Sequence, residues 1–543
     1  DNAINTTHLL KIDENSDDYV KVSEVSSSLF DIIDKREGDT LPVSAFLDRP
    51  DGTVDGGLSR LEKRDISEVV PKYISENCIS CNLCSLVCPH AVIRPMLLDE
   101  EEVEKAPNSL NDKLLDSHLK DNLKFTIAVS YKDCTGCGLC ANICPGKKGA
   151  KALEMVRKES VVNDVTLKET EYLFNEVTEK AVMSVSTVKG SQFKRPRFEF
   201  SGACAGCGET PYLKLLTQLF GDRLVIANAT GCSSIYGASS PSTPYSVPWA
   251  NSLFEDNAEF GFGMKIADEV KKQQLKNIIN ENISKVDEEE KDIYLDYVND
   301  INVDTAKALL SVIPHTKIKP LKSLKKYIMP ISLWAVGGDG WAYDIGYNGI
   351  DHVLNSGENV NILVLDTEVY SNTGGQASKS SRIGAVAKFA SSGKKTAKKD
   401  LLKIALTNPD VYVGAISLGA NPAATVKVML EAEKYNGPSI IVAYSPCIAW
   451  GILKGMSNSI DEEKKAMLSG YFPIFHYNPD TKEFKMDGKS DFNKYQEYLT
   501  GEDRYKSLKI INSEEADDLL IENEDNAKES YEYYESLTNK NKE

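Results

Sequence analysis

Short apolar runs alternate with amphipathic stretches along the C-terminal two thirds of the chain. Each run has the length of a buried strand and ends in a turn rich in glycine or polar residues. An amphipathic helix is expected over 423–434. Apolar strands that alternate with helices are typical of a parallel sheet covered on both faces. The pattern therefore predicts a doubly wound parallel α/β sheet with strands at 223–228, 331–336, 360–365, 411–416 and 439–444.

Chemically reactive side chains stand at the carboxyl ends of these expected strands. Cys232 follows the first strand, Asp339 the second, Thr367 the third and Cys447 the last. Ligands of open α/β sheets bind beyond the carboxyl ends of the strands. Residues that are far apart in the sequence can therefore converge on one site at this edge.

A glycine-rich turn, GDG (338–340), separates the second expected strand from a helix, and such junctions can cradle a phosphate. The next strand delivers DTEVYSN (366–372). A carboxylate on one turn and an oxygen-bearing loop on the next suit Mg²⁺ with a diphosphate, which is the arrangement of a thiamine diphosphate site. A purely structural tight turn is the alternative.

Two four-cysteine runs precede this region. Both follow the pattern Cys-x2-Cys-x2-Cys-x3-Cys-Pro of bacterial ferredoxins, in which the fourth cysteine of each run binds the other cluster. We therefore assign one [4Fe–4S] cluster to Cys78, Cys81, Cys84 and Cys144, and the other to Cys134, Cys137, Cys140 and Cys88. Two structural zinc sites are the alternative, but zinc sites are usually paired Cys-x-x-Cys knuckles.

The stretch GACAGCGE (202–209) holds a Cys-x-x-Cys pair with no second pair after it. The pair Cys204 and Cys207 could take Cys232 and Cys447 as partners at the sheet edge and hold a third cluster. The alternative is that the two distant cysteines are ordinary buried apolar residues.

Composition and charge narrow the class of protein. The 543 residues suffice for two to four domains of about 100–200 residues, and 41% apolar residues are ordinary for a folded core. A formal charge of −18 disfavours nucleic acid as a partner, and no apolar run approaches the ~20 residues that span a membrane. Twelve cysteines, eight of them in two tight clusters, indicate metal binding in a reducing compartment.

These observations divide the chain into four parts. We expect an α+β two-[4Fe–4S] ferredoxin-like domain and, after it, an α/β domain that could bind thiamine diphosphate and hold a third cluster. A helix is expected at 112–123, between the two cysteine runs and outside the cluster core. The acidic C-terminal tail is expected to be a surface helix or a mobile end. The boundaries are 1–68 for the end of a preceding domain and its linker, 69–165, 195–511 and 512–543.

Several long stretches together resemble the C-terminal part of the pyruvate:ferredoxin (or flavodoxin) oxidoreductase family. The resemblance covers nearly the whole chain and begins with LPVSAF (41–46) and EKR (62–64). It continues after the cysteine runs in GACAGCGETPY (202–212), NATGCSSIYG (228–237), GGDGWAYDIGY (337–347), LDTEVYSNTGGQ (365–376) and GKKTAKKD (393–400).

The resemblance implies roles for single residues. Cys204, Cys207, Cys232 and Cys447 would hold the cluster nearest the cofactor. Asp339, Thr367 and the carbonyl of Val369 would bind Mg²⁺, and Asn372 would be a catalytic residue that reaches the 2-oxo acid. The implied contacts of thiamine diphosphate are Glu209, Cys232, Gly338, Asp339, Gly340, Trp341, Thr367, Glu368, Val369, Tyr370, Ser371 and Asn372.

The resemblance also implies a reaction. Pyruvate, CoA and an oxidised carrier would give acetyl-CoA, CO2 and a reduced carrier, with electrons passing through three clusters to ferredoxin, flavodoxin or a fused flavin reductase domain. It implies a homodimer in the cytoplasm, or in a hydrogenosome-like organelle. The alternatives are an oxidoreductase for another 2-oxo acid, and a non-catalytic polyferredoxin-type electron-transfer protein.

The chain departs from the family in length. The family has about twice this material, and its N-terminal domains complete the cofactor site, so we expect a fragment or one subunit that does not turn over pyruvate alone. Four lysines could also steer an acidic ferredoxin, or could simply be a solvated turn; they are Lys394, Lys395, Lys398 and Lys399.

Overall fold

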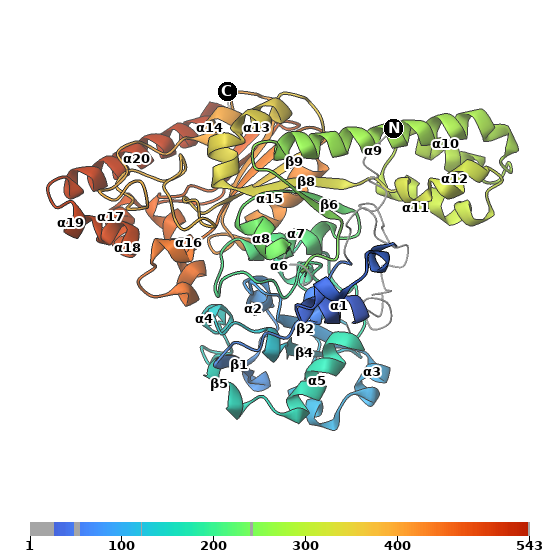
Figure 1. Ribbon diagram of the computed structural model, residues 1–543, viewed down its shortest axis with the longest axis horizontal. Helices are drawn as coiled ribbons and strands as arrows, with labels where there is room; N and C mark the ends of the chain where they lie inside the picture. The colour runs from blue at the N-terminus through green and yellow to red at the C-terminus, as the bar shows by residue number, and fades with distance from the viewer. Residues whose placement is uncertain (1–26, 48–54, 121, 239–242, 541–543) are drawn as a thin grey trace.

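The computed structural model of the protein describes residues 27–47, 55–120, 122–238 and 243–540. Figure 1 shows a domain built on a large sheet, a smaller domain beneath it, and a helical arm at one side. The expected first part, 1–68, lies partly outside the described residues, and its described portion begins with α1 (Ser27–Asp34). Near its end, Leu58 is buried and Arg60 pairs with the buried carboxylate of Glu199, so this end is docked onto the rest of the chain.

The smaller domain repeats one unit of strand, cysteine loop, short helix and strand. β1 pairs with β5 and β2 pairs with β4, both antiparallel, so each strand of one unit is hydrogen-bonded to a strand of the other unit. Each short helix follows a residue in the left-handed region, Asn82 at φ 65° and Gly138 at φ 83°, which turns the cysteine loop into the helix. The units are β1 (Val69–Tyr73), α2 (Leu83–Leu86) and β2 (Ile93–Leu98), then β4 (Lys124–Val129), α4 (Leu139–Ile143) and β5 (Leu153–Arg157).

The helix predicted at 112–123 is wrong. This stretch holds the edge strand β3 (Leu115–Asp116), which pairs with β4, and the chain then turns back so that the N–H of Ser117 donates to the carbonyl of Leu123 at 3.0 Å. A short isolated helix is marginal in water, whereas the open edge of β4 offers ready hydrogen bonds. The preceding acidic residues form α3 (Glu100–Lys105).

The larger domain is built on an eight-stranded sheet in the order β13-β12-β10-β11-β9-β8-β6-β7. β6 to β11 are parallel, and β12 and β13 add an antiparallel hairpin at one edge. All five predicted strands are present. The bounds are β6 (Leu224–Ala229), β7 (Trp249–Ser252), β8 (Ser332–Gly338), β9 (Asn361–Asp366), β10 (Tyr412–Ile416), β11 (Ser439–Tyr444), β12 (Phe475–Asn478) and β13 (Glu483–Met486).

Helices cover both faces of this sheet. The predicted helix at 423–434 is α15. α5 (Asp164–Asn175) packs on β4 of the smaller domain. The helices of the larger domain are α6 (Val188–Ser191), α7 (Thr210–Phe220), α8 (Cys232–Gly237), α13 (Tyr347–Leu354), α14 (Leu401–Ala405), α15 (Pro422–Lys434), α16 (Ser459–Ser469), α17 (Tyr495–Thr500), α18 (Asp503–Lys506), α19 (Leu508–Ile511) and α20 (Ala516–Lys540).

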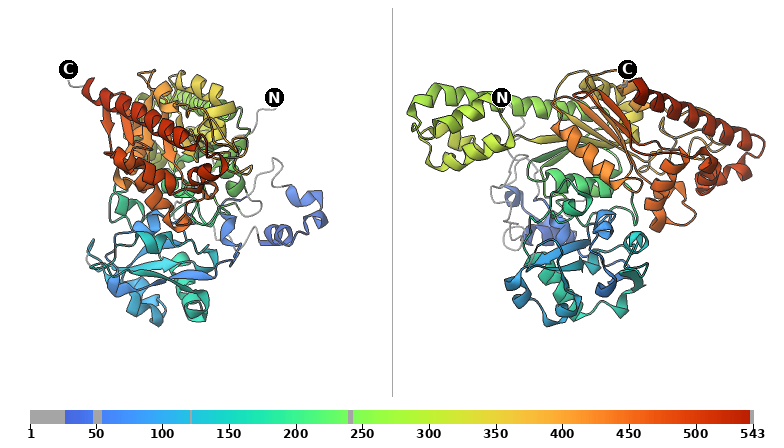
Figure 2. Two further views of the ribbon diagram at one scale, coloured as in Figure 1. Left: turned by 90° about the vertical axis from the view of Figure 1, so that its left-hand side faces the viewer. Right: turned by 180° about the vertical axis from the view of Figure 1, so that it is seen from behind.

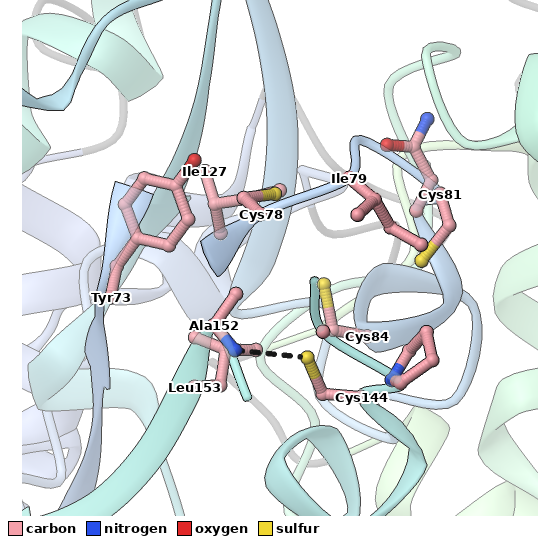
Figure 3. A pocket seen from close by; sticks show the side chains of 12 residues that line it. Tyr73, Cys78, Ile79, Cys81, Cys84, Ile127, Cys144, Ala152 and Leu153 are labelled. Atoms are coloured by element: carbon pink, nitrogen blue, oxygen red, sulfur yellow. Dashed lines mark hydrogen bonds between the residues drawn. The ribbon is translucent and has the colours of Figure 1, made fainter. Parts of the chain in front are cut away.

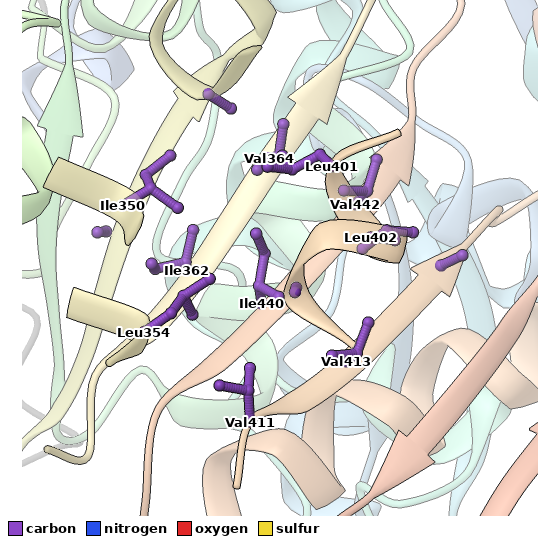
Figure 4. Close-up of a cluster of buried hydrophobic side chains, with 14 of the residues drawn as sticks. Ile350, Leu354, Ile362, Val364, Leu401, Leu402, Val411, Val413, Ile440 and Val442 are labelled. Atoms are coloured by element: carbon purple, nitrogen blue, oxygen red, sulfur yellow. The ribbon is translucent and has the colours of Figure 1, made fainter. Parts of the chain in front are cut away.

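Alternation along each strand feeds two hydrophobic cores. On β9, Ile362 and Val364 join one core, whereas Leu363 and Leu365 join the other. Figure 4 shows the first core, in which side chains of β9, β10 and β11 meet those of α13 and α14. The second core packs the opposite face against α7 and α15. Burial on both faces explains why the strands are apolar without interruption.

A helical arm is inserted between β7 and β8, and the strand pattern did not predict it. Tyr294 and Tyr297 are fully buried in its core. The ammonium group of Lys272 donates to the carbonyl groups of Tyr327, Ile328 and Met329. The arm contains α9 (Asn257–Asn282), α10 (Lys291–Asn299), α11 (Val303–Val312) and α12 (Lys319–Ser323).

The C-terminal segment is part of the sheet domain. α20 lies at the opposite end of the domain from the helical arm (Figure 2). Its residues Leu519, Leu520 and Tyr534 are buried, and the Tyr534 ring lies 4.3 Å from that of Phe475 on β12. The described part of the segment is thus mainly a helix, as one expectation had it, and this helix is packed on the sheet. Among the described helices, none combines the length and the apolar character needed to cross a bilayer.

Candidate functional site

One cavity of the smaller domain is lined by four thiols, Cys78, Cys81, Cys84 and Cys144 (Figure 3). Three come from the first loop and the start of α2, whereas Cys144 comes from the end of α4. The N–H of Ala152 donates to the sulfur of Cys144 at 3.3 Å, and the N–H of Ser80 to that of Cys78 at 3.4 Å. Backbone donors of this kind stabilise the negative sulfurs of iron–sulfur clusters.

The other four thiols of this domain gather at the second loop: Cys88, Cys134, Cys137 and Cys140. Burial raises the pKa of the Cys134 thiol to about 12 and that of Cys137 to about 11, and negative charge at Cys88 acts in the same direction. The N–H of Gly136 donates to the Cys134 sulfur at 3.3 Å. The fourth cysteine of each run thus lies with the other run, which is what the crossed assignment requires. Iron binding itself stays a prediction.

A third set of thiols lies at the carboxyl ends of the sheet: Cys204, Cys207, Cys232 and Cys447. A close approach between the backbones of Gly208 and Pro446 places Cys204 and Cys207 there. The N–H of Gly208 donates to the carbonyl of Pro446 at 3.0 Å, and a Cβ at position 208 would lie 2.4 Å from the Pro446 nitrogen. Burial raises the pKa of the Cys447 thiol to about 12, and Glu209, Cys232 and Cys204 are close enough to raise it further.

Within the described residues, no three His, Cys, Asp or Glu side chains converge closely enough to hold a single metal ion. A cubane presents its irons at separate corners, so its four thiolates surround a cluster and do not converge on one ion. The finding therefore leaves the cluster assignments as they are.

The three thiol sets form a connected series. The backbone of Gly206, which lies between Cys204 and Cys207, is close enough to the sulfur of Cys137 in the second set to lower the pKa of that thiol. Charge at Cys84, in the first set, acts on the thiol of Cys140 in the second. The second set therefore lies between the first and the third, and the series leads from the sheet edge into the smaller domain.

Glu209 is buried beside the third set. The hydroxyl of Tyr236 donates to its Oε2 atom at 2.8 Å. Burial raises the pKa of the carboxyl to about 7, and the bond from Tyr236 acts in the opposite direction. Negative charge at Glu209 in turn raises the pKa of the Cys207 and Cys232 thiols, to which burial contributes most. A carboxyl in this state can hold or release a proton near neutral pH.

Three oxygen-bearing groups converge where β8 and β9 end. The Thr367 hydroxyl lies 3.3 Å from Asp339 Oδ1 and donates to the Val369 carbonyl at 3.0 Å. Asp339 Oδ2 is buried and has no hydrogen-bond partner among the described residues. Burial and the charge of Asp366 hold the pKa of Asp339 well above its ordinary value. An orphaned carboxylate oxygen beside a hydroxyl and a carbonyl fits the all-oxygen coordination that Mg²⁺ takes.

The turn after β8 faces the loop after β9. Gly338 and Gly340 are partly exposed. A Cβ at position 340 would lie 2.5 Å from the ring of Tyr370, so glycine is needed for this close approach. Trp341 is buried, and its indole N–H has no partner among the described residues. The partly exposed glycines and the indole N–H of Trp341 fit a binding site for a ligand with acceptor oxygens.

The loop after β9 also reaches the third thiol set. The hydroxyl of Ser371 lies 3.2 Å from the sulfur of Cys232. Asn372, the expected catalytic residue, is exposed on this loop. Asp339, Thr367 and the Val369 carbonyl form an oxygen set, and this oxygen set and the third thiol set thus border one site.

Glu368 lies in the same loop, but its side chain points away from the oxygen set. Its carboxylate lies 2.8 Å from Arg504, 3.0 Å from Lys398 and 3.3 Å from Arg382, and the hydroxyl of Tyr471 donates to it at 2.6 Å. Burial opposes its ionisation, but the three cations hold its pKa well below the ordinary value. Only the backbone of Glu368 faces the position where the sequence predicts a cofactor.

The four lysines expected to steer a ferredoxin do not form an exposed patch. Lys398 is bonded to Asp366 and Glu368 in the interior, and Lys394 donates to a buried backbone carbonyl. Lys399 lies over the ring of Tyr347, 3.1 Å from its centre. Lys395 alone of the four pairs with an exposed carboxylate. The steering hypothesis is therefore wrong for this segment, because only Lys395 of the four lysines is exposed.

Sequence reasoning missed two supports of the site. The indole of Trp450 donates to the carbonyl of Thr367 at 2.6 Å, and Tyr236 holds Glu209 as described above. Each lies a few residues after a predicted cysteine ligand, Cys447 and Cys232. That proximity is the only signal in the sequence that could have found them.

Comparison with protein families gives three matches. A family described as a 4Fe-4S dicluster domain matches residues 77–150, and one described as the C-terminal TPP binding domain of thiamine pyrophosphate enzymes matches 329–443. A family named EKR, a domain of unknown function, matches 13–67. The first two cover the cysteine runs and the oxygen set.

Known proteins match over most of the chain. The pyruvate:ferredoxin oxidoreductase of Moorella thermoacetica is 46% identical over 97% of this chain and 47% of its own length. The pyruvate-flavodoxin oxidoreductase of Trichormus variabilis is 42% identical, with coverages of 92% and 44%. The mitochondrial pyruvate dehydrogenase [NADP(+)] of Euglena gracilis is 42% identical, with coverages of 92% and 29%. The chain spans about half the length, or less, of the relatives it matches.

A solved 2-oxoglutarate:ferredoxin oxidoreductase from Magnetococcus marinus is 17% identical over 46% of this chain and 65% of that chain. Its TM-score is 0.30, so it carries no argument here.

Proposed function

Since this chain belongs, by its similarity over nearly its whole length, to the pyruvate:ferredoxin and pyruvate-flavodoxin oxidoreductase family, we propose that it forms the part of such an enzyme that holds thiamine diphosphate and the iron–sulfur clusters. One observation carries the proposal, namely the 3.2 Å contact between Ser371 on the oxygen-bearing loop and Cys232 in the third thiol set. A cofactor on that loop and a cluster on those thiols would be neighbours, as electron transfer between them requires.

The proposed reaction converts pyruvate and CoA to acetyl-CoA and CO2 and passes two electrons to ferredoxin or flavodoxin. Thiamine diphosphate, when bound, supplies the carbon nucleophile and the electron sink for decarboxylation. Mg²⁺ would be held by Asp339, Thr367 and the carbonyl of Val369. Glu209 would keep a proton at its buried carboxyl, and Asn372, exposed on the cofactor loop, would contact the 2-oxo acid.

The three thiol sets supply the proposed electron path. Electrons would enter the third set beside the cofactor, cross the second set and leave from the first. Support comes from the closeness of the sets, because the backbone of Gly206 acts on the pKa of the Cys137 thiol and the charge of Cys84 acts on that of Cys140. A reducing compartment such as the cytoplasm would keep the thiols able to bind clusters. A homodimer, and further domains that complete the cofactor site, belong to the same proposal.

Binding of thiamine diphosphate separates this proposal from a non-catalytic electron-transfer protein. We expect the chain to bind the cofactor only when Mg²⁺ is present. Asp339→Asn should weaken binding by at least the roughly 10- to 100-fold that loss of a ligand's supporting partner costs metal sites. The measurement is calorimetric titration with and without Mg²⁺. Asp351→Asn, on the exposed surface of α13, is the control and should bind like the wild type. Equal binding by the Asp339 variant would refute the proposed metal site.

Iron content tests the third set. After anaerobic reconstitution, three cubanes require about 12 iron atoms per chain, and Cys447→Ala should lower the count towards about 8. Ile448→Ala changes the next residue, which is exposed, and should leave the count unchanged. Iron and acid-labile sulfide would be measured per chain. A wild-type count near 8 that ignores Cys447 would exclude a cluster on this set in the isolated chain.

Another 2-oxo acid is the second candidate for the substrate. Such a specificity would leave both binding tests unchanged and would appear only when the activity of the complete enzyme is compared across 2-oxo acids.

A further inference from the structure

A buried lysine on α7 reaches the smaller domain at the first run of cysteines, where the chain passes from Cys84 to Cys88. The side chain of Lys214 is 1% exposed. Its ammonium group donates to the carbonyl groups of Ser85, of Leu86 at 2.9 Å and of Cys88 at 3.2 Å. Among the described residues it donates to no carboxylate, so its charge is not cancelled by a direct ion pair.

The position of this charge is defined by α2. The helix carries Cys84 of the first thiol set, and the chain that leaves it carries Cys88 of the second. Lys214 binds the carbonyls between them, at the negative end of the helix. Burial lowers the pKa of the Lys214 ammonium group to about 8, and negative charge at Cys88 and Cys84 acts in the opposite direction, so both thiols are within electrostatic reach.

α7 also connects this charge to the sheet edge. The helix begins directly after Glu209, beside the third thiol set, and ends in the core of the sheet domain. The positive charge of Arg94 also lowers the pKa of Lys214, and Arg94 is itself paired with the buried carboxylate of Glu199. Lys214 therefore places a positive charge at the junction of the two domains, beside the route that electrons are proposed to take.

A buried cation next to a cluster changes its reduction potential. A cluster with four thiolate ligands is anionic, and reduction adds one more negative charge. In a low-dielectric interior the interaction with a nearby ammonium group is strong and poorly screened. Net charge and hydrogen bonding around the cluster are among the factors that set its potential. A positive charge beside α2 therefore favours the reduced state of the clusters on either side.

We propose that Lys214 is a positioning residue that raises the reduction potentials of the two clusters of the smaller domain and so draws electrons out of the sheet domain. The inference rests on the proposed function, because it assumes clusters on the first two thiol sets. It goes beyond that function in assigning the direction of electron flow partly to one buried side chain outside every ligand set.

The helical arm offers a matched control. Lys272, on α9, is also buried, and its ammonium group also donates to three backbone carbonyls. Burial lowers its pKa to about 8, as for Lys214. The two lysines differ in surroundings, because Lys272 lies beside Asp268 in the helical arm and no thiol acts on it. Removing either costs similar buried hydrogen bonds, but only one removal takes a charge away from the clusters.

The test is a potentiometric titration of the reconstituted chain, followed by electron paramagnetic resonance. We would compare the wild type with Lys214→Gln, Lys214→Met and Lys272→Met. Glutamine can still donate to a carbonyl but carries no charge. At a fixed applied potential, both Lys214 variants should show a ratio of reduced to oxidised cluster at least about tenfold lower, which is about 59 mV for a one-electron couple. Lys272→Met should lower the melting temperature, but its clusters should have the same reduction potentials as those of the wild type.

The outcomes separate this inference from the function on which it rests. Loaded clusters with unchanged potentials in Lys214→Gln would overturn the inference and leave the proposed function intact. A wild-type chain that takes up no cluster in the smaller domain would overturn both. If Lys214→Met does not fold, the glutamine variant decides, and Lys214→Arg, which keeps the charge, should keep the potentials.

Discussion

Glu368→Ala is expected to lose about 3–5 kcal/mol of stability and to lose Mg²⁺-dependent binding of thiamine diphosphate. Truncation leaves the cations that surround Glu368 facing a cavity without their shared carboxylate. Removing one partner from a buried ion pair costs this much because the remaining charge is buried without compensation.

The loss of cofactor binding follows from the backbone. Glu368 has a φ of 58°, a left-handed conformation that is uncommon for residues other than glycine. Its N–H donates to Asp366 at 3.2 Å, and its carbonyl accepts a bond from Ser381. The side chain, fixed by the buried cations, holds this conformation, which in turn places Thr367 and Val369 opposite Asp339. Glu368 therefore supports the metal site without touching the cofactor through its carboxylate.

The charges around Glu368 balance, which explains why this group of charged side chains can be buried. Three carboxylates, Asp366, Glu368 and Glu502, share the interior with three cations, Arg382, Lys398 and Arg504. The measurement is the melting temperature together with the calorimetric titration described above. Glu515→Ala removes an exposed partner of Lys395 and is the control, because surface pairs contribute only about 0–1 kcal/mol. A variant at Glu368 that melts and binds like this control would disprove the role.

A second large effect should depend on pH. Glu463, on α16, is buried, and its Oε2 atom accepts bonds from Gly419, Ser417 and Tyr212, at 2.7 to 3.1 Å. Burial raises the pKa of the carboxyl to about 8, above an ordinary value of about 4.5, and the three donors act against the shift.

The sign of the effect follows from proton binding. Below about pH 4.5 the carboxyl is protonated in both states and costs nothing. Between about pH 4.5 and 8 the unfolded chain releases the proton while the folded protein keeps it, so stability falls as the pH rises. At 1.36 kcal/mol per pKa unit, the loss approaches about 5 kcal/mol at the upper end of this window.

Glu463→Gln should remove this dependence, because an amide keeps the oxygen that accepts the three bonds and cannot ionise. We expect the melting temperature of the variant to exceed that of the wild type at pH 8 by several degrees more than at pH 5. Asp461→Asn, exposed on the same helix, should follow the wild type at both pH values. A difference between Glu463→Gln and wild type that does not change with pH would contradict the assignment.

The sequence alone determined the elements whose signal is local. The five apolar runs became β6, β8, β9, β10 and β11, because burial on both faces of a parallel sheet requires continuous apolar residues. The spacing of the two cysteine runs was enough to predict that Cys88 and Cys144 exchange places, because each run can wrap only one cluster with its first three thiols. Short-range spacing carries this information without any knowledge of the remaining chain.

Other features were decided by tertiary contacts. The stretch 112–123 follows a helical pattern in the sequence, but an open strand edge captured it as β3. α20 is rich in acidic residues, yet its few apolar side chains dock it onto β12 and β13. Whether Lys398 faced solvent or the interior depended on carboxylates some thirty positions away, at Asp366 and Glu368. Such outcomes depend on which surfaces the fold leaves unpaired, and the local sequence holds no record of them.

The candidate site shows the same division. Position along the chain predicted that Cys204 and Cys207 could meet Cys232 and Cys447, because parallel strands end at one edge. The tertiary structure alone turned Glu368 away from the cofactor loop and set Lys214 against the chain between Cys84 and Cys88. A strand ends where its own residues dictate, but the direction of a charged side chain is fixed by whichever opposite charge or carbonyl the rest of the fold brings within reach.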